Sequence, residues 1–106
     1  MGRPPRLSRQ TATLLAELLV APRAWRYGYD LIGTTGLSAG TLYPTLIRLA
    51  DCGWLTTRWE ERTEGGRPPR HLYRLTGEGA RDARTMLARA TQRNWGRTNL
   101  AREFGR

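Results

Sequence analysis

Residues 36–49 read Gly-Leu-Ser-Ala-Gly-Thr-Leu-Tyr-Pro-Thr-Leu-Ile-Arg-Leu, and this stretch decides the fold. Gly36 suits a tight turn. The Ser38 hydroxyl suits the start of a helix, because it can accept a hydrogen bond from a free backbone N–H of the first turn. Leu42, Leu46 and Leu49 then recur at helical spacing, so they share one face. The stretch therefore predicts a turn followed by an amphipathic helix with a buried leucine face.

The opposite face of this predicted helix carries small and polar groups. They are Gly40, Thr41, Pro44 and Arg48, with Tyr43 at the margin. Such a face fits the major groove of DNA. We predict phosphate contacts from the hydroxyls of Ser38, Thr41 and Tyr43, and a phosphate or guanine contact from Arg48. Capping by Ser38 and Thr41, and core packing by Tyr43, remain alternative readings.

Length and charge bound the class of protein. A chain of 106 residues suits one domain with one modest core. Its net charge is +9, and all 18 basic residues are arginine, which favours a polyanionic partner. Genomic base composition also explains part of the preference for arginine over lysine. A single cysteine excludes an internal disulfide.

Targeting signals are missing from the sequence as it stands. No segment has the apolar length needed to span a bilayer, and the Arg- and Pro-rich N-terminus does not resemble a signal peptide. We therefore expect a soluble, cytoplasmic protein with no membrane partner.

The remaining pattern orders the elements around the leucine-faced helix. Residues 10–21 predict a core helix that ends at Pro22, and residues 27–34 predict a short second helix. Residues 54–59 and 71–75 predict two strands of a hairpin. Thr76 suits the cap of a long helix that runs to about residue 95. The fold class predicted is mainly α with a small β-hairpin: a winged helix-turn-helix (residues 10–75) between a basic flexible arm (residues 1–9) and a dimerisation helix with its tail (residues 76–106).

The last predicted helix is too long for so small a domain to bury alone. Roughly 20 residues make about 30 Å of helix. Its apolar stripe comprises Ala80, Ala83, Met86, Leu87 and Ala90. We expect a second copy of the chain to pack on this stripe and form a homodimer.

The connection between the two strands is a long hairpin tip, or wing. It contains Gly65-Gly66 and Pro68-Pro69, flanked by Arg67 and Arg70. We predict that Gly66, Arg67 and Arg70 contact DNA, since guanidinium groups are attracted into narrow minor grooves. The same five residues, Gly-Arg-Pro-Pro-Arg, occur at 2–6 and at 66–70, so the N-terminal arm is a second candidate. Solvated loops are the alternative for both.

Two further groups near the hairpin have structural readings. The acids Glu60, Glu61 and Glu64 are expected to form a solvated stretch beside the wing, and Trp54 and Trp59 are expected to pack in the core beneath it. The only histidine, His71, has no second histidine or cysteine at metal-ligand spacing. We expect no enzyme activity, no metal and no cofactor.

Several of these segments together resemble the PadR family of transcriptional regulators. They are Tyr27-Gly-Tyr-Asp-Leu31, Leu37-Ser-Ala-Gly-Thr-Leu-Tyr-Pro44, Gly66-Arg67, and Tyr73-Arg-Leu-Thr76 with Gly79. The resemblance covers about residues 10–90. It implies a small member with one C-terminal helix and a recognition helix kinked at Pro44. It also makes Trp95 a candidate to bind a flat aromatic effector between the helices of the dimer, with plain packing in the dimer as the favoured alternative. Ala39 and Pro68-Pro69 depart from the family pattern, which leaves the DNA sequence preference open.

The function expected is that of a sequence-specific transcriptional repressor. Two protomers would bind a palindromic operator in double-stranded DNA, with half-sites about 34 Å apart, and a small aromatic ligand would release it. One alternative is an architectural or RNA-binding basic protein without an operator. Another is a protein-interaction module that uses the long helix.

Overall fold

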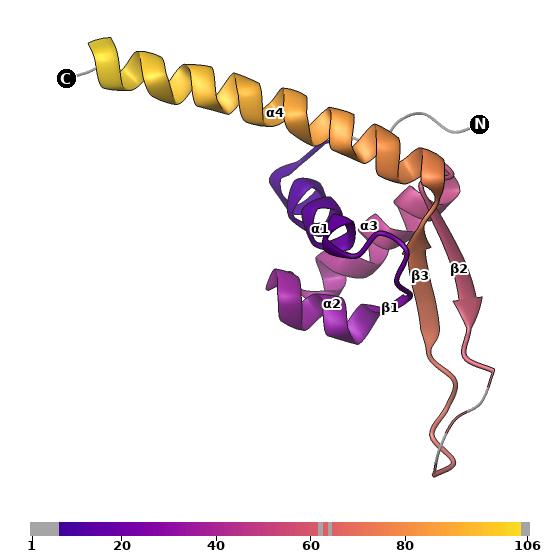
Figure 1. Ribbon diagram of the computed structural model, residues 1–106. Helices are drawn as coiled ribbons and strands as arrows, with labels where there is room; N and C mark the ends of the chain where they lie inside the picture. Colours follow the sequence, from indigo (N-terminus) through magenta and orange to yellow (C-terminus); the bar gives the residue numbers. More distant parts are fainter. Residues whose placement is uncertain (1–6, 62, 64, 105–106) are drawn as a thin grey trace.

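The order of the elements follows the apolar pattern of the chain (Figure 1). A computed structural model describes the backbone of residues 7–61, 63 and 65–104, and side chains as far as residue 92. Within these residues the elements are α1 (Arg9–Val20), β1 (Arg26–Tyr27), α2 (Gly28–Thr35), α3 (Ala39–Asp51), β2 (Leu55–Trp59), β3 (His71–Leu75) and α4 (Gly77–Phe104). The four predicted helices and both predicted strands are confirmed, and most of their bounds agree with the prediction within one residue. The last helix is longer than predicted, because α4 continues well past residue 95.

The core lies where the first three helices meet. Six leucines of these helices have no exposed surface: Leu14, Leu15, Leu31, Leu42, Leu46 and Leu49. Burying one such side chain stabilises the fold by about 1.5–3 kcal/mol, so this cluster holds α1, α2 and α3 together. The leucine face of α3 is therefore turned inward, as its spacing predicts.

The sheet has three strands, where the sequence predicts a two-stranded hairpin. The strand order is β1-β3-β2, and both pairings are antiparallel. β1 is only two residues long and pairs Arg26 with Tyr73 and Tyr27 with Leu72. The Arg26 guanidinium lies 2.6 Å from the Glu17 carboxylate of α1, which ties this short strand to the helices.

Trp54 and Trp59, both predicted to lie in the core, have different surroundings. Trp54 is 6% exposed and belongs to the core, whereas Trp59 is 62% exposed. Trp59 is the last residue of β2, where the sheet extends beyond the helices toward the wing (Figure 1). Its ring stacks on His71 at a centroid distance of 4.5 Å. The core assignment of Trp59 is therefore wrong, because no helix covers that end of the strand.

The start of α4 is fixed to the winged domain by two features of its first turn. The Thr76 hydroxyl accepts a hydrogen bond from the Gly79 N–H over 2.9 Å, which confirms the predicted cap. Gly79 lies so close to Trp54 that a Cβ at residue 79 would come within 2.7 Å of the Trp54 Cα. From there α4 crosses above α1 and extends well past it (Figure 1).

Candidate nucleic-acid interface

The N-terminus of α3 presents two hydroxyls that already bond to each other. The Ser38 hydroxyl accepts from the Thr41 N–H over 3.3 Å and donates to the Thr41 Oγ1 over 3.2 Å. Ser38 thus has the capping role that was one of its two readings. Ser38 and Gly40 are exposed, and nothing lies within 4 Å of the position a Cβ would take at Gly40. The backbone here is accessible to a partner, and the phosphate contact remains a prediction.

Tyr43 is compatible with both of its interpretations, core packing and phosphate contact. Its ring packs on a neighbouring helix, while 38% of the residue is exposed. The ring lies over Gly28 at the start of α2. A Cβ at Gly28 would come within 2.7 Å of the Tyr43 hydroxyl oxygen. The absence of a side chain at residue 28 therefore makes room for the Tyr43 ring against the start of α2.

Further along the same face, α3 exposes one cation and one large apolar side chain. Pro44 and Arg48 are exposed, and the Arg48 Nη2 donates to the Thr45 hydroxyl over 3.2 Å. Ile47 is 57% exposed and lies between them. An exposed isoleucine on a polar face is a sequence signal for contact with a thymine methyl group, so Ile47 joins the candidate set.

The wing carries its predicted cations, but they bind a carboxylate of the same chain. Gly65 and Gly66 turn the tip with positive φ values of 62° and 72°. The Arg67 Nη1 lies 2.8 Å from the Glu60 Oε1, and the Arg70 Nε lies 3.3 Å from the same oxygen. Glu60 is therefore the centre of an ion-pair cluster, and the prediction that it is a solvated acid is wrong.

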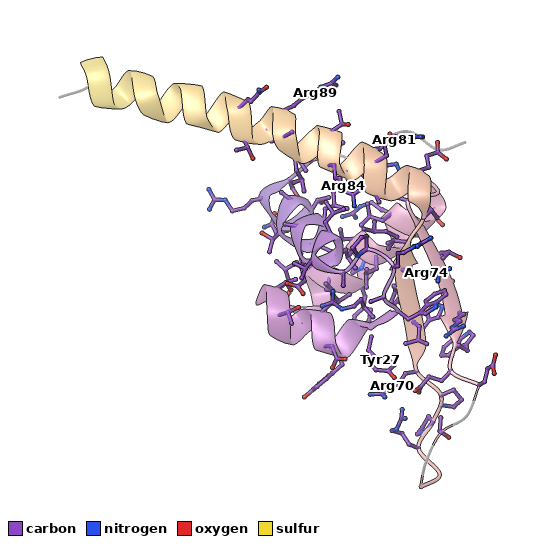
Figure 2. All side chains as sticks on the ribbon, in the orientation of Figure 1. Tyr27, Arg70, Arg74, Arg81, Arg84 and Arg89 are labelled. Carbon is purple, nitrogen blue, oxygen red and sulfur yellow. The ribbon has the colours of Figure 1, made fainter. Side chains whose placement is uncertain are left out.

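Additional contacts hold Glu60 at the base of the wing. The Arg70 backbone N–H donates to Glu60 over 2.9 Å, and the Tyr27 hydroxyl donates to it over 3.1 Å. The Arg70 guanidinium also lies 3.5 Å from the centre of the Tyr27 ring, and Figure 2 shows these two side chains next to each other. Hydrogen bonds, led by that from Arg67, lower the pKa of Glu60 to about 2. The carboxylate is therefore ionised at neutral pH.

The sequence contained a signal for this cluster. The β2–β3 register pairs Trp59 with His71, so one further step along both strands places Glu60 opposite Arg70. The Glu60 N–H indeed donates to the Arg70 carbonyl over 3.0 Å. The side chains of Arg67 and Arg70 stay 39% and 41% exposed, so their guanidinium groups remain accessible from solvent.

The residues predicted for dimerisation fall into two groups along α4. Ala80 is 7% exposed and Ala83 is 0% exposed in the single chain, so they pack on the core of their own protomer. Ala83 has no surface left for a second copy to cover. Met86 and Leu87 also pack against that core, and they and Ala90 are half-buried. The side chain of Trp95, the predicted effector contact, and residues 1–6 of the predicted arm lie outside the described residues.

Other kinds of site find no support in the part of the chain that the structure describes. It contains no group of three or more His, Cys, Asp or Glu side chains that could hold a metal ion. Among the same residues, no helix combines the length and the apolar character needed to cross a membrane.

Comparison with known proteins supports the same class as the geometry. A PadR-like transcription factor from bacteroid fragilis is 30% identical, with a TM-score of 0.68 over 88% of this chain and 93% of that one. The transcriptional regulator PcaV from Streptomyces coelicolor, solved with its natural ligand, is 27% identical (TM-score 0.68; 91% of this chain, 62% of that one). Bacillus subtilis PadR in complex with operator DNA shares the fold at 21% identity (TM-score 0.63; 78% of this chain, 48% of that one).

Two further comparisons complete the assignment. No curated protein matches the chain. The model of the transcriptional regulator PadR-like family matches residues 18–85, which is more than half of the sequence. The chain therefore belongs to the PadR-like family of transcriptional regulators and is not an enzyme.

Proposed function

We propose that this protein is a repressor that binds a palindromic operator as a homodimer. The observation that carries the proposal is the orientation of α3. Its three leucines are fully buried, so Ser38, Gly40 and the half-exposed Thr41 lie on the outward side of the helix. In each protomer α3 would enter a major groove, with Tyr43, Pro44 and Arg48 further along the same face.

The wing would contact the flanking minor groove through Gly66, Arg67 and Arg70. Since Glu60 binds both arginines, phosphate oxygens have to compete with a carboxylate that is already in place. The exposed part of each guanidinium group can still contact DNA without breaking the cluster, because each arginine presents several N–H donors. We infer that the wing contributes affinity through phosphates more than specificity through bases.

The homodimer is proposed from the part of α4 that continues past the winged domain (Figure 1). The first turns of this helix pack on the protomer's own core, whereas the helix continues to Phe104 (Figure 1). A second copy packed beyond Ala83, with Met86, Leu87 and Ala90 at the edge of the contact, would set the distance between the two α3 helices. A small aromatic ligand near Trp95 would change that distance. PcaV, which was solved with its natural ligand, is a precedent for control of such a regulator by a ligand. Such a regulator would act in the cytoplasm.

A binding assay over a range of salt concentrations tests the repressor proposal. Duplexes selected from a random pool are titrated beside an unselected duplex. A repressor binds the selected duplex about 10³-fold or more tighter, whereas an architectural basic protein binds both alike. Equal affinity for the two duplexes would exclude an operator. Because the net charge of +9 attracts any DNA, equal affinity for the two duplexes is the outcome that the assay must be able to detect.

A matched pair of variants tests whether the wing contributes to DNA binding. Arg67→Ala is expected to lower affinity for all sequences and to make the salt dependence shallower by about one unit per protomer. Arg89→Ala on α4 removes the same charge far from the wing (Figure 2) and is the control. An equal change in both variants would show that only total charge matters. Sedimentation of the purified chain tests the dimer directly.

A further inference from the structure

A pocket of about 490 Å³ lies between the first turns of α4, the segment after α1 and the wing strands. It takes no part in the proposed DNA contacts. Its volume falls in the range of about 300–1,000 Å³ that is typical of small-molecule sites. Three arginines line it: Arg23 from the segment after α1, Arg74 from β3 and Arg84 from α4.

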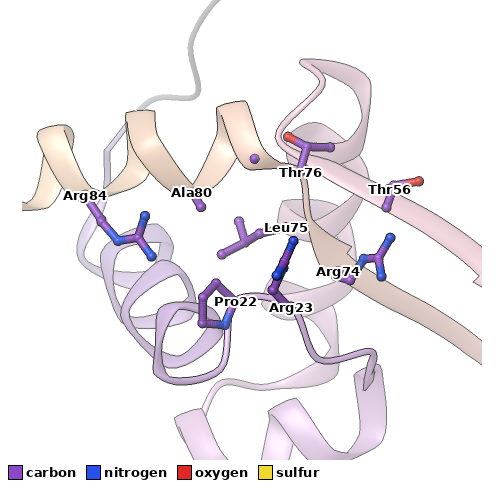
Figure 3. Close-up of a pocket in the computed structure, with 9 residues that line it drawn as sticks. Pro22, Arg23, Thr56, Arg74, Leu75, Thr76, Ala80 and Arg84 are labelled. Carbon is purple, nitrogen blue, oxygen red and sulfur yellow. The ribbon is translucent and has the colours of Figure 1, made fainter.

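Arginines lie on two sides of the pocket. Figure 3 shows Arg84 on one side of the pocket and Arg23 with Arg74 on the other. Among the described residues that line it, none is acidic. Among the described residues none of the three forms an ion pair with a carboxylate, in contrast to Arg26, Arg67, Arg70 and Arg81. Like charges placed together without a counter-charge favour a bound anion.

One of the three arginines is held in position before any ligand arrives. Arg74 is half-buried, and its guanidinium carbon lies 4.3 Å from the centre of the Trp25 ring. This cation–π contact restrains the position of the group. Thr56, which pairs with Arg74 across the sheet, lines the same wall. A preorganised donor loses less entropy on binding.

Two more features define the ligand. Gly77, the first residue of α4, lines the pocket, so the partial positive charge of the helix N-terminus lies close to it. Pro22, Leu75 and Ala80 supply apolar surface between the arginines (Figure 3). Cations at both ends of an apolar surface suit a molecule with an acidic group at each end.

We propose that this pocket binds a small organic dianion, whose two carboxylate or phosphate groups contact Arg84 on one side and Arg23 with Arg74 on the other. The site is distinct from the aromatic effector site proposed at Trp95. A bound dianion would tie α4 to the wing strands, because the pocket has walls from both.

A small molecule fits the position of the pocket better than a DNA phosphate does. Thr56 and Arg74 lie at the end of the sheet next to α4, whereas Trp59 and His71 lie at the end next to the wing tip. Among the described residues that line the pocket, none belongs to α2 or α3. The recognition helix and the wing tip therefore engage DNA without bringing its backbone into this pocket.

Calorimetric titration of the full chain with succinate, inorganic phosphate and acetate tests the proposal. Succinate is expected to bind saturably at one molecule per chain and more tightly than acetate, which has one acidic group. Arg74→Gln and Arg84→Gln are each expected to weaken succinate binding about tenfold or more, because each removes a charge-assisted contact. Arg89→Gln, an exposed arginine of the same helix outside the pocket, is the matched control and should change it less than about twofold.

Three results would overturn the proposal. One is the absence of saturable succinate binding in the millimolar range. Another is an equal loss of succinate affinity in Arg84→Gln and Arg89→Gln, which would indicate that succinate is attracted by the total charge alone. A third is a duplex titration in which Arg74→Gln and Arg84→Gln weaken DNA binding while succinate binding stays unchanged. Since succinate titration needs no DNA, this test and that of the repressor can fail independently. Circular dichroism checks that each variant is folded.

Discussion

The contact between α4 and the winged domain depends on a single missing side chain. Gly79 lies against the Trp54 backbone, and the substitution Gly79→Ala would place its Cβ 2.7 Å from the Trp54 Cα and 2.8 Å from the Trp54 carbonyl carbon. Neither atom belongs to a flexible side chain that can move away. The first turn of α4 must therefore shift, and Thr76, which caps that turn, must shift with it.

The expected loss follows from two opposing terms. Overpacking of a tight contact costs about 1–3 kcal/mol. Alanine in place of glycine in a helix returns about 0.5–1 kcal/mol. The net loss lies between about 0 and 2.5 kcal/mol and centres near 1 kcal/mol, and a loss of about 1 kcal/mol lowers Tm by roughly 4–8 °C for a domain of this size.

Gly77→Ala is the matched control, since it lies in the same helical turn and a Cβ there meets nothing within 4 Å. We expect it to be neutral or to stabilise by about 0.5 kcal/mol. Thermal unfolding of both variants, at one protein concentration because a dimer's Tm depends on it, gives the comparison. If Gly79→Ala proves as stable as Gly77→Ala, the close approach of α4 to Trp54 is not a constraint and the reasoning fails.

Three further substitutions test single contacts. Glu60→Gln is expected to lower Tm at neutral pH. Because the pKa of Glu60 is lowered from 4.5 to about 2, the ionised carboxylate stabilises the fold above pH 4.5, and this stability is lost as the pH falls toward about 2. The difference in Tm between the variant and the native protein should therefore shrink over that range. A constant difference in Tm would contradict the ion-pair account. Tyr43→Phe keeps the ring on Gly28 and removes the phenol, so duplex affinity should fall at unchanged Tm; a fall in Tm alone would mark a core residue. Ser38→Ala removes the hydroxyl that accepts from Thr41, and urea unfolding should show a loss of about 1 kcal/mol, whereas no loss would mean that water caps the helix equally well.

The parts of the fold that follow from local rules could be predicted from the sequence. Leu42, Leu46 and Leu49 specify the buried face of α3 because helical periodicity is a property of neighbouring residues. The caps at Ser38 and Thr76 are predictable for the same reason, since each hydroxyl bonds to an N–H three residues along the chain.

The parts that depend on distant contacts could not be predicted in the same way. β1 has two residues and no pattern of its own; it is a strand because Arg26 and Tyr27 reach the free edge of β3. Trp59 has the composition of a core residue, but its burial depends on whether a helix lies over the end of β2. Ala83 looks available to a partner on a helical wheel, yet it is fully buried within its own protomer.

The candidate site also has one part that neighbouring residues predict and one part that depends on distant contacts. The outward face of α3 follows from its periodicity, whereas the state of the wing follows from a carboxylate ten residues before Arg70. Charge counting assigns Arg67 and Arg70 to a partner and overlooks that Glu60, opposite Arg70 in register, binds both. The pocket of Arg23, Arg74 and Arg84 joins three segments and has no trace in the local sequence.

The ion-pair cluster at Glu60 has a consequence for how the wing meets any polyanion. The two arginines already have an anionic neighbour on the same chain, so an incoming phosphate gains only the difference between two similar attractions. In the proposed complex, release from DNA would also be eased, because the arginines would return to Glu60 and would not be left without a counter-charge.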